Sequence, residues 1–127
     1  MPALERLRGL RVVGAPAALD AARWQGERVT ILRFAPDDAF AIGADRVELD
    51  DEAAIVEPEV GFVGAWLPVE EIERHLEWPL PAERPTLAQG FVATVPAKVW
   101  LRDDGDALLL TAAAYADELT GRLRCLS

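Results

Sequence analysis

The chain has 127 residues, a formal net charge of −9 and one cysteine. Its length fits a single domain, residues 1–127, and a hydrophobic content of 51% supplies one core. The negative charge argues against nucleic acid and anionic membrane surfaces, since both require clustered Lys and Arg. A single cysteine excludes an intrachain disulfide. No secretory signal is expected at the N-terminus, and no apolar run reaches the roughly 20 residues of a membrane span, so we predict a cytoplasmic protein.

The first half of the chain predicts a short helix followed by β-structure. Leu4 and Leu7 indicate an amphipathic turn that Gly9 ends, and a brief strand follows at 10–13. Pro16 suits the first turn of a helix that reaches about residue 24. Runs rich in β-branched and apolar residues then predict strands at 29–34, 39–42, 54–56 and 62–67.

The second half predicts two helices and a hairpin. Pro68 opens a helix over 69–77, whose apolar residues recur at spacings of three and four. The segment Trp78–Pro85 contains three prolines, so it cannot continue that helix and should run extended along the surface. A last helix is predicted over 112–123. Together these elements predict an α+β fold, an antiparallel or mixed sheet with two or three helices packed on one face.

The dipeptide Asp104-Gly105 stands between two apolar runs, which indicates a hairpin with a two-residue turn. In that register Leu101 lies opposite Leu108. Trp100 and Leu109 then share a face of mixed character, because strand side chains alternate between faces. We expect such a face to be covered by a loop or by a partner chain.

Three residues are candidates for chemistry. His75 is the only histidine, and Glu71 precedes it by one helical turn. The two form either a general base with its orienting carboxylate or a surface ion pair. Lys98 stands between apolar residues of a predicted strand, where it is either a Schiff-base nucleophile or a lysine that reaches past its neighbours into water. A Ser-His-Asp hydrolase is excluded, since the only serine is Ser127.

No cofactor or metal site is predicted. The carboxylates occur in short groups at 37–38, 48–52, 57–59 and 103–106, none of which has the spaced pattern of a calcium loop. One histidine and one cysteine cannot build a zinc site from nitrogen and sulfur ligands. The glycines form no phosphate-binding pattern.

Large aromatic side chains are the most distinctive feature of the second half, namely Phe62, Trp66, Trp78, Phe91 and Trp100. They either fill the core or line a groove beside Trp78–Pro85, and exposed aromatic residues are typical of contact surfaces. The candidate contact residues are Trp78, Pro79, Trp100 and Leu109.

The C-terminal third resembles a known family in its order of elements. Lys98–Leu101, a tight turn, Ala107–Leu110 and then Tyr115–Leu119 are similar to a segment of the aminomethyltransferase-like, folate-binding domains, which include the sarcosine oxidase gamma subunit. Residues 36–43 resemble strand pairs of the same family, so the similarity covers about a third of the chain. No folate-contacting or catalytic residue of the family can be placed here, so the resemblance implies a non-catalytic accessory role.

Two functions follow from these observations. The first is a non-enzymatic binding or assembly module that associates with itself or with a protein partner, because no complete catalytic set is present. The alternative is a small-molecule-binding protein or weak enzyme with an aromatic pocket, which would use Glu71, His75 or Lys98.

Overall fold

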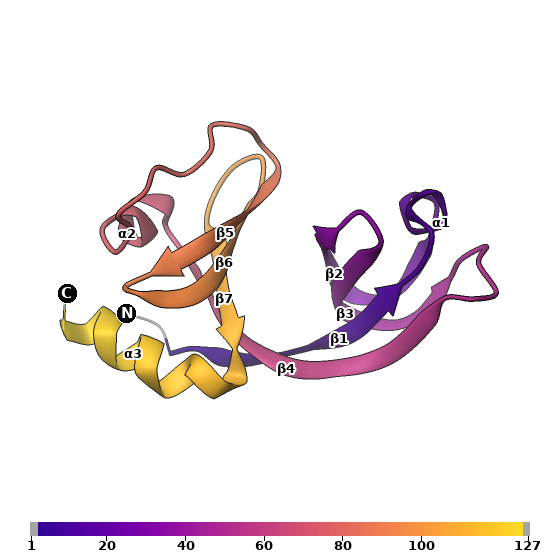
Figure 1. The fold of residues 1–127 in the computed structure, drawn as a ribbon, viewed down its shortest axis with the longest axis horizontal. Helices are drawn as coiled ribbons and strands as arrows, with labels where there is room; N and C mark the ends of the chain where they lie inside the picture. Colours follow the sequence, from indigo (N-terminus) through magenta and orange to yellow (C-terminus); the bar gives the residue numbers. More distant parts are fainter. Residues whose placement is uncertain (1–2, 126–127) are drawn as a thin grey trace. The chain divides into compact units, whose positions relative to one another are not determined.

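The computed structural model describes residues 3–125 of the chain (Figure 1). The elements are β1 (Glu5–Val13), α1 (Pro16–Asp20), β2 (Arg23–Ala35), β3 (Asp38–Glu48), β4 (Ile55–Leu67), α2 (Val69–Glu73), β5 (Thr86–Val92), β6 (Val95–Leu101), β7 (Ala107–Ala112), a 3-10 turn (Ala113–Tyr115) and α3 (Ala116–Cys125). They form two compact units, one of residues 7–60 and one that combines residues 3–6 with 61–125. Whether these units fold as the single predicted domain stays a prediction.

The unit of residues 7–60 is a sheet with the strand order β2-β3-β1-β4. β2 and β3 form a long antiparallel hairpin, whose turn consists of Pro36 and Asp37. Residues 5–13 form one continuous strand, so the predicted turn ending at Gly9 is wrong. Gly9 pairs with Ile42, and a Cβ at Gly9 would clash with the carbonyl group of Ala41, which explains the glycine at this position.

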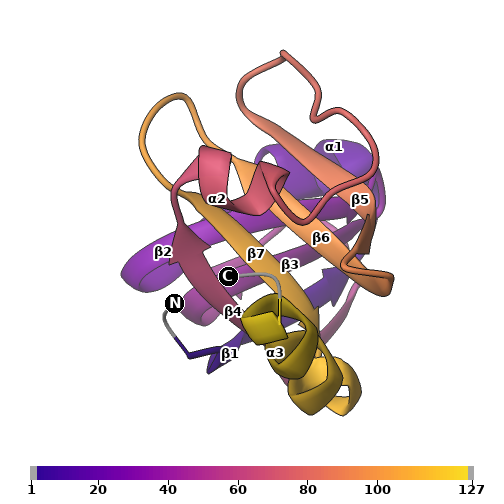
Figure 2. The same cartoon turned by 90° about the vertical axis from the view of Figure 1, so that its left-hand side faces the viewer.

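The unit of residues 61–125 is a four-stranded sheet with the order β4-β7-β6-β5. Ala65, Leu109, Val99 and Ala88 pair in a row across the four strands and all belong to the core. That core also takes Ile72 of α2 together with Leu119 and Leu123 of α3 (Figure 2). The short helices therefore serve to close one face of this sheet.

The hairpin of β6 and β7 departs from the predicted register by one residue. Trp100 lies opposite Leu108, and Val99 lies opposite Leu109. The connection runs over 102–106 and is longer than the predicted two-residue turn. Arg102 Nε donates a hydrogen bond to the carbonyl oxygen of Asp106 at 2.8 Å, which closes this loop. A slip of one residue moves side chains to the opposite face. Leu109 is therefore fully buried in the core and does not share a face with Trp100.

The predicted α+β fold, with helices packed as a layer, is wrong, because the chain is predominantly antiparallel β-sheet with three short helices in its described residues. The pairings of β1 with β3, β2 with β3, β4 with β7, β5 with β6 and β6 with β7 are all antiparallel. α1 and α2 have five residues each and are shorter than the expected helices over 16–24 and 69–77. Strand β2 begins at Arg23, inside the first expected helix, so the sheet replaces its last turn.

Candidate functional site

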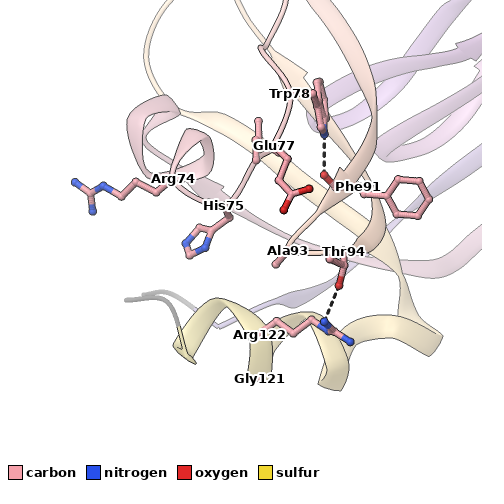
Figure 3. A pocket seen from close by; sticks show the side chains of 10 residues that line it. Arg74, His75, Glu77, Trp78, Phe91, Ala93, Thr94, Gly121 and Arg122 are labelled. Carbon is pink, nitrogen blue, oxygen red and sulfur yellow. Dashed lines mark hydrogen bonds between the residues drawn. The ribbon is translucent and has the colours of Figure 1, made fainter.

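A cavity of about 560 Å³ lies in the unit of residues 61–125 (Figure 3). Three segments line it: residues 74–78 after α2, Phe91, Ala93 and Thr94 around the end of β5, and Gly121 and Arg122 of α3. We call it the Trp78 pocket. Its volume falls within the range of about 300–1,000 Å³ that small-molecule sites occupy.

Trp78 forms one wall of the pocket and is held against strand β5. Its Nε1–H donates a hydrogen bond to the carbonyl oxygen of Phe91 at 2.7 Å. A Cβ at Gly90 would lie 2.8 Å from Cζ2 of the indole, so the ring can occupy this place only because residue 90 is glycine. The neighbouring Phe91 contributes its carbonyl group to this wall, while its ring points away from the pocket and is 60% exposed (Figure 3). The sequence of β5 thus positions the indole of Trp78.

His75 lines the pocket and is only 8% exposed. Its backbone is fixed on both sides, because its N–H donates to the carbonyl oxygen of Ile72 at 3.0 Å and its own carbonyl oxygen accepts from the N–H of Ala93 at 2.9 Å. The side chain is different, since Nδ1 is buried and has no hydrogen-bond partner among the described residues. Buried polar atoms are nearly always paired, and an unpaired one calls for an explanation.

The turn between β5 and β6 brings a strained backbone to the pocket wall. Val92 pairs with Val95, so the turn consists of Ala93 and Thr94, with φ angles of 49° and 67°. Two-residue hairpin turns with two positive φ angles favour Asn-Gly, and a β-branched residue such as threonine rarely adopts this conformation. Such strain occurs mainly where surrounding contacts enforce it, often at functional sites.

Arg122 of α3 holds this turn from the opposite side. Its Nη1 donates to the hydroxyl oxygen of Thr94 at 2.6 Å, and its Nη2 donates to Glu118 one helical turn earlier at 2.9 Å. The hydroxyl of Thr94 therefore has a defined partner that an unstrained Asn-Gly turn would lack.

Two further charged residues, Glu77 and Arg74, line the pocket, and their side chains point in different directions. In Figure 3 the side chain of Glu77 extends toward Ala93 and Thr94, whereas Arg74 points away from the other lining residues. Within residues 3–125, neither Glu77 nor Arg74 takes part in a hydrogen bond or ion pair. The pocket therefore contains one carboxylate that no protein cation neutralises.

The structure does not join Glu71 to His75. α2 ends at Glu73, so His75 lies in the turn beyond the helix and the one-turn spacing no longer brings the two side chains together. No hydrogen bond or ion pair connects them within the described part of the chain. The predicted pair of Glu71 and His75 is therefore absent, while His75 itself belongs to the pocket.

Lys98 lies elsewhere, on β6, where it is half-buried. Its Nζ donates to Oε1 of Gln89 at 3.1 Å, directly across the strand pair. It borders a smaller hollow of about 310 Å³ together with Phe62 and Tyr115 and does not line the Trp78 pocket. The structure thus separates the two titratable candidates His75 and Lys98.

The predicted contact residues are also divided. Trp78 lines the pocket, and Pro79 follows it as an exposed residue. Trp100 is half-buried on the opposite face of the sheet from Leu109, which is fully buried, so Leu109 cannot offer the exposed contact predicted for it. Sequence reasoning missed most of the pocket, and the sequence carries no local motif for these residues: Arg74, Leu76, Glu77, Ala93, Thr94, Gly121 and Arg122.

Two structural features are absent from residues 3–125. No group of three or more His, Cys, Asp or Glu side chains there is arranged to hold a metal ion. None of the helices in this range has the length and apolar character needed to cross a bilayer.

Comparison of the chain with protein-family models, with curated proteins and with solved structures found no match. The resemblance to aminomethyltransferase-like domains therefore stays a prediction.

Proposed function

We propose that this protein is a non-catalytic binding module and that the Trp78 pocket takes a small, largely apolar molecule. The observation that carries the proposal is a cavity of about 560 Å³ with the indole of Trp78 on its wall and a buried, unpaired nitrogen of His75. Small-molecule sites combine these features, a mostly apolar lining with few polar groups.

A binding role is favoured over a catalytic one by the surroundings of His75. A general base acts through an orienting partner and a nearby reacting group. Among the described residues, the His75 ring has no hydrogen-bonded carboxylate, and Thr94, the hydroxyl residue of the pocket, is engaged by Arg122. The accessory role implied by the family resemblance agrees with this proposal, which places the protein in the cytoplasm.

Native mass spectrometry of the protein, purified gently from its own source, tests the proposal. We expect the protein to carry a small molecule. A bulky side chain at Gly121 should block the pocket without disturbing the core, since nothing lies within 4 Å of a Cβ at this position. The Gly121→Phe variant should lose the added mass, and the matched Gly121→Ala variant should keep it. A protein without any small molecule, or an adduct that Gly121→Phe retains, would refute the proposal.

The second candidate is assembly with a protein partner. It is favoured by large apolar side chains that remain exposed in the unit of residues 61–125: Phe91 at 60%, Tyr115 at 39% and Trp66 at 38%. The same measurement separates the two candidates, because an assembly module would arrive bound to another polypeptide or as a defined homo-oligomer. Phe91→Ser should then reduce the assembled fraction.

A further inference from the structure

The charges of the Trp78 pocket point to a class of ligand, an inference that rests on the proposed function. The guanidinium of Arg122 and the indole N–H of Trp78 already have partners. Arg122 donates to Thr94 and to Glu118, and the indole N–H of Trp78 donates to Phe91. Arg74 points away from the cavity (Figure 3). The charge of Arg122 is therefore paired with Glu118 and that of Arg74 is directed away from the cavity, which disfavours a ligand anion.

The negatively charged side chain of the pocket, Glu77, is unpaired within residues 3–125. Glu77 extends into the site and has no cation partner within residues 3–125. The ring of Trp78 offers a ligand its π face, whose negative quadrupole attracts a cation. The whole chain carries a formal charge of −9, which raises the local concentration of cations and repels anions.

We propose that the Trp78 pocket binds a small organic cation, an ammonium group attached to an apolar body. The apolar body lies in the cavity between Trp78 and Leu76, and the ammonium group pairs with the carboxylate of Glu77. The arrangement uses one aromatic face, one aliphatic wall and one carboxylate.

Three probes with the same indole body and different charge test this ligand class: tryptamine as the cation, 3-ethylindole as the neutral form and indole-3-propionate as the anion. Isothermal titration calorimetry of the full chain should show tryptamine binding about tenfold more tightly than 3-ethylindole, because a carboxylate and an indole ring stabilise the charge. Indole-3-propionate should bind more weakly than either.

The variant Glu77→Gln isolates the charge. It should bring tryptamine to the affinity of 3-ethylindole while leaving 3-ethylindole within about twofold of its original value, since the apolar contacts remain. Glu83→Gln is the matched control, because it removes one exposed carboxylate from the same Trp78–Pro85 segment without touching the pocket. It should leave all three affinities unchanged.

The outcomes separate the ligand class from the function. If indole-3-propionate binds most tightly, or if Glu83→Gln weakens tryptamine as much as Glu77→Gln does, the ligand class is wrong and the pocket remains a binding site. If none of the probes binds, the ligand class also fails, and the proposed function then depends on the Gly121→Phe comparison. Preference for tryptamine that persists in Glu77→Gln would equally overturn the role of this carboxylate.

Discussion

At the scale of single residues, the buried side chain of His75 lowers the stability of the fold, because its Nδ1 has no hydrogen-bond partner among the described residues. Leaving a buried nitrogen unpaired costs about 1–3 kcal/mol. Replacing His75 by Phe removes that nitrogen and keeps a ring of similar shape, so we expect the ligand-free protein to gain about 1 kcal/mol in free energy of unfolding. Urea denaturation measures the gain. A loss of stability in both His75→Phe and His75→Leu would show that Nδ1 has a partner such as an ordered water.

Gly90 is a residue whose lack of a side chain positions another residue. An added methyl group would lie 2.8 Å from the indole of Trp78 and would force the ring off the strand. We expect Gly90→Ala to destabilise the protein by about 1–3 kcal/mol, the usual effect of overpacking. Gly121→Ala is the control, since its methyl group meets nothing and should stabilise α3 by up to about 1 kcal/mol. Equal thermal shifts in the two variants would contradict this account.

Arg11 ties four strands of the unit of residues 7–60 together. Its Nε and Nη2 bind the two oxygens of Asp38 at 2.6 and 2.7 Å, its Nη1 binds Glu59 at 3.0 Å, and its guanidinium lies 4.7 Å from the ring centre of Phe34. The hydrogen bonds to Asp38 favour the charged form, so the pKa of Arg11 is raised above its ordinary value although burial opposes this. A raised pKa means that the stabilisation is complete below the unfolded value and is lost only as the pH rises through the folded value.

Because lysine cannot make the two-pronged contact to Asp38, we expect Arg11→Lys to lose about 1 kcal/mol of unfolding free energy. This loss should be constant across neutral and mildly alkaline pH, where both side chains stay charged. The control is Arg23→Lys, whose pair with Glu48 is exposed on both sides and should contribute almost nothing. Chemical denaturation of the two variants at two pH values gives the comparison. A similar loss in both would contradict a special role for Arg11.

At the scale of elements, the turn between β5 and β6 is a hairpin with the wrong residues for its geometry. Each non-glycine residue held at positive φ costs on the order of 1 kcal/mol or more. The double variant Ala93→Asn with Thr94→Gly should therefore stabilise the ligand-free protein by about 1–2 kcal/mol, measured by thermal denaturation. Arg122→Met removes the contact to Thr94 but keeps the strain, so it should give no gain. A destabilised double variant would show that the bond from Arg122 outweighs the strain.

Sequence patterns located several elements but not their extents. The strands over 29–34 and 39–42 follow from β-branched and apolar residues on both sides of a proline turn, and the structure extends them into the hairpin of β2 and β3. The last helix also follows from its spacing, and the structure places α3 there. The β6–β7 register was not predictable, because the hydrogen bond from the Arg102 side chain to the carbonyl oxygen of Asp106, which closes the longer loop, has no signature in the sequence.

The candidate site was predictable only in part. Trp78 and His75 stand out in the sequence because one adjoins a proline-rich segment and the other is the only residue of its type. Trp78 and His75 line one pocket with Thr94 and Arg122 because segments that are distant in the chain come into contact. The turn at Ala93 lacks the Asn-Gly pair that would have revealed it.

At the scale of the whole molecule, β4 is common to the two compact units. It supplies residues 55–60 to one and 61–67 to the other as one uninterrupted strand. We therefore expect a single cooperative unfolding transition, with calorimetric and van't Hoff enthalpies that agree. Scanning calorimetry gives both values. Two resolved transitions would show that the units unfold independently and would reject the predicted single domain.

The contact between Trp78 and β5 also has an optical consequence. The fluorescence of an indole depends on its surroundings. The N–H of Trp78 is bound to a carbonyl group and its ring borders an open cavity, so its emission should depend on what fills that cavity. The chain has four tryptophans, so replacing Trp24, Trp66 and Trp100 by Phe would leave one intrinsic fluorophore at the site. The protein thus carries its own reporter of occupancy, which can be read during a titration without any added label.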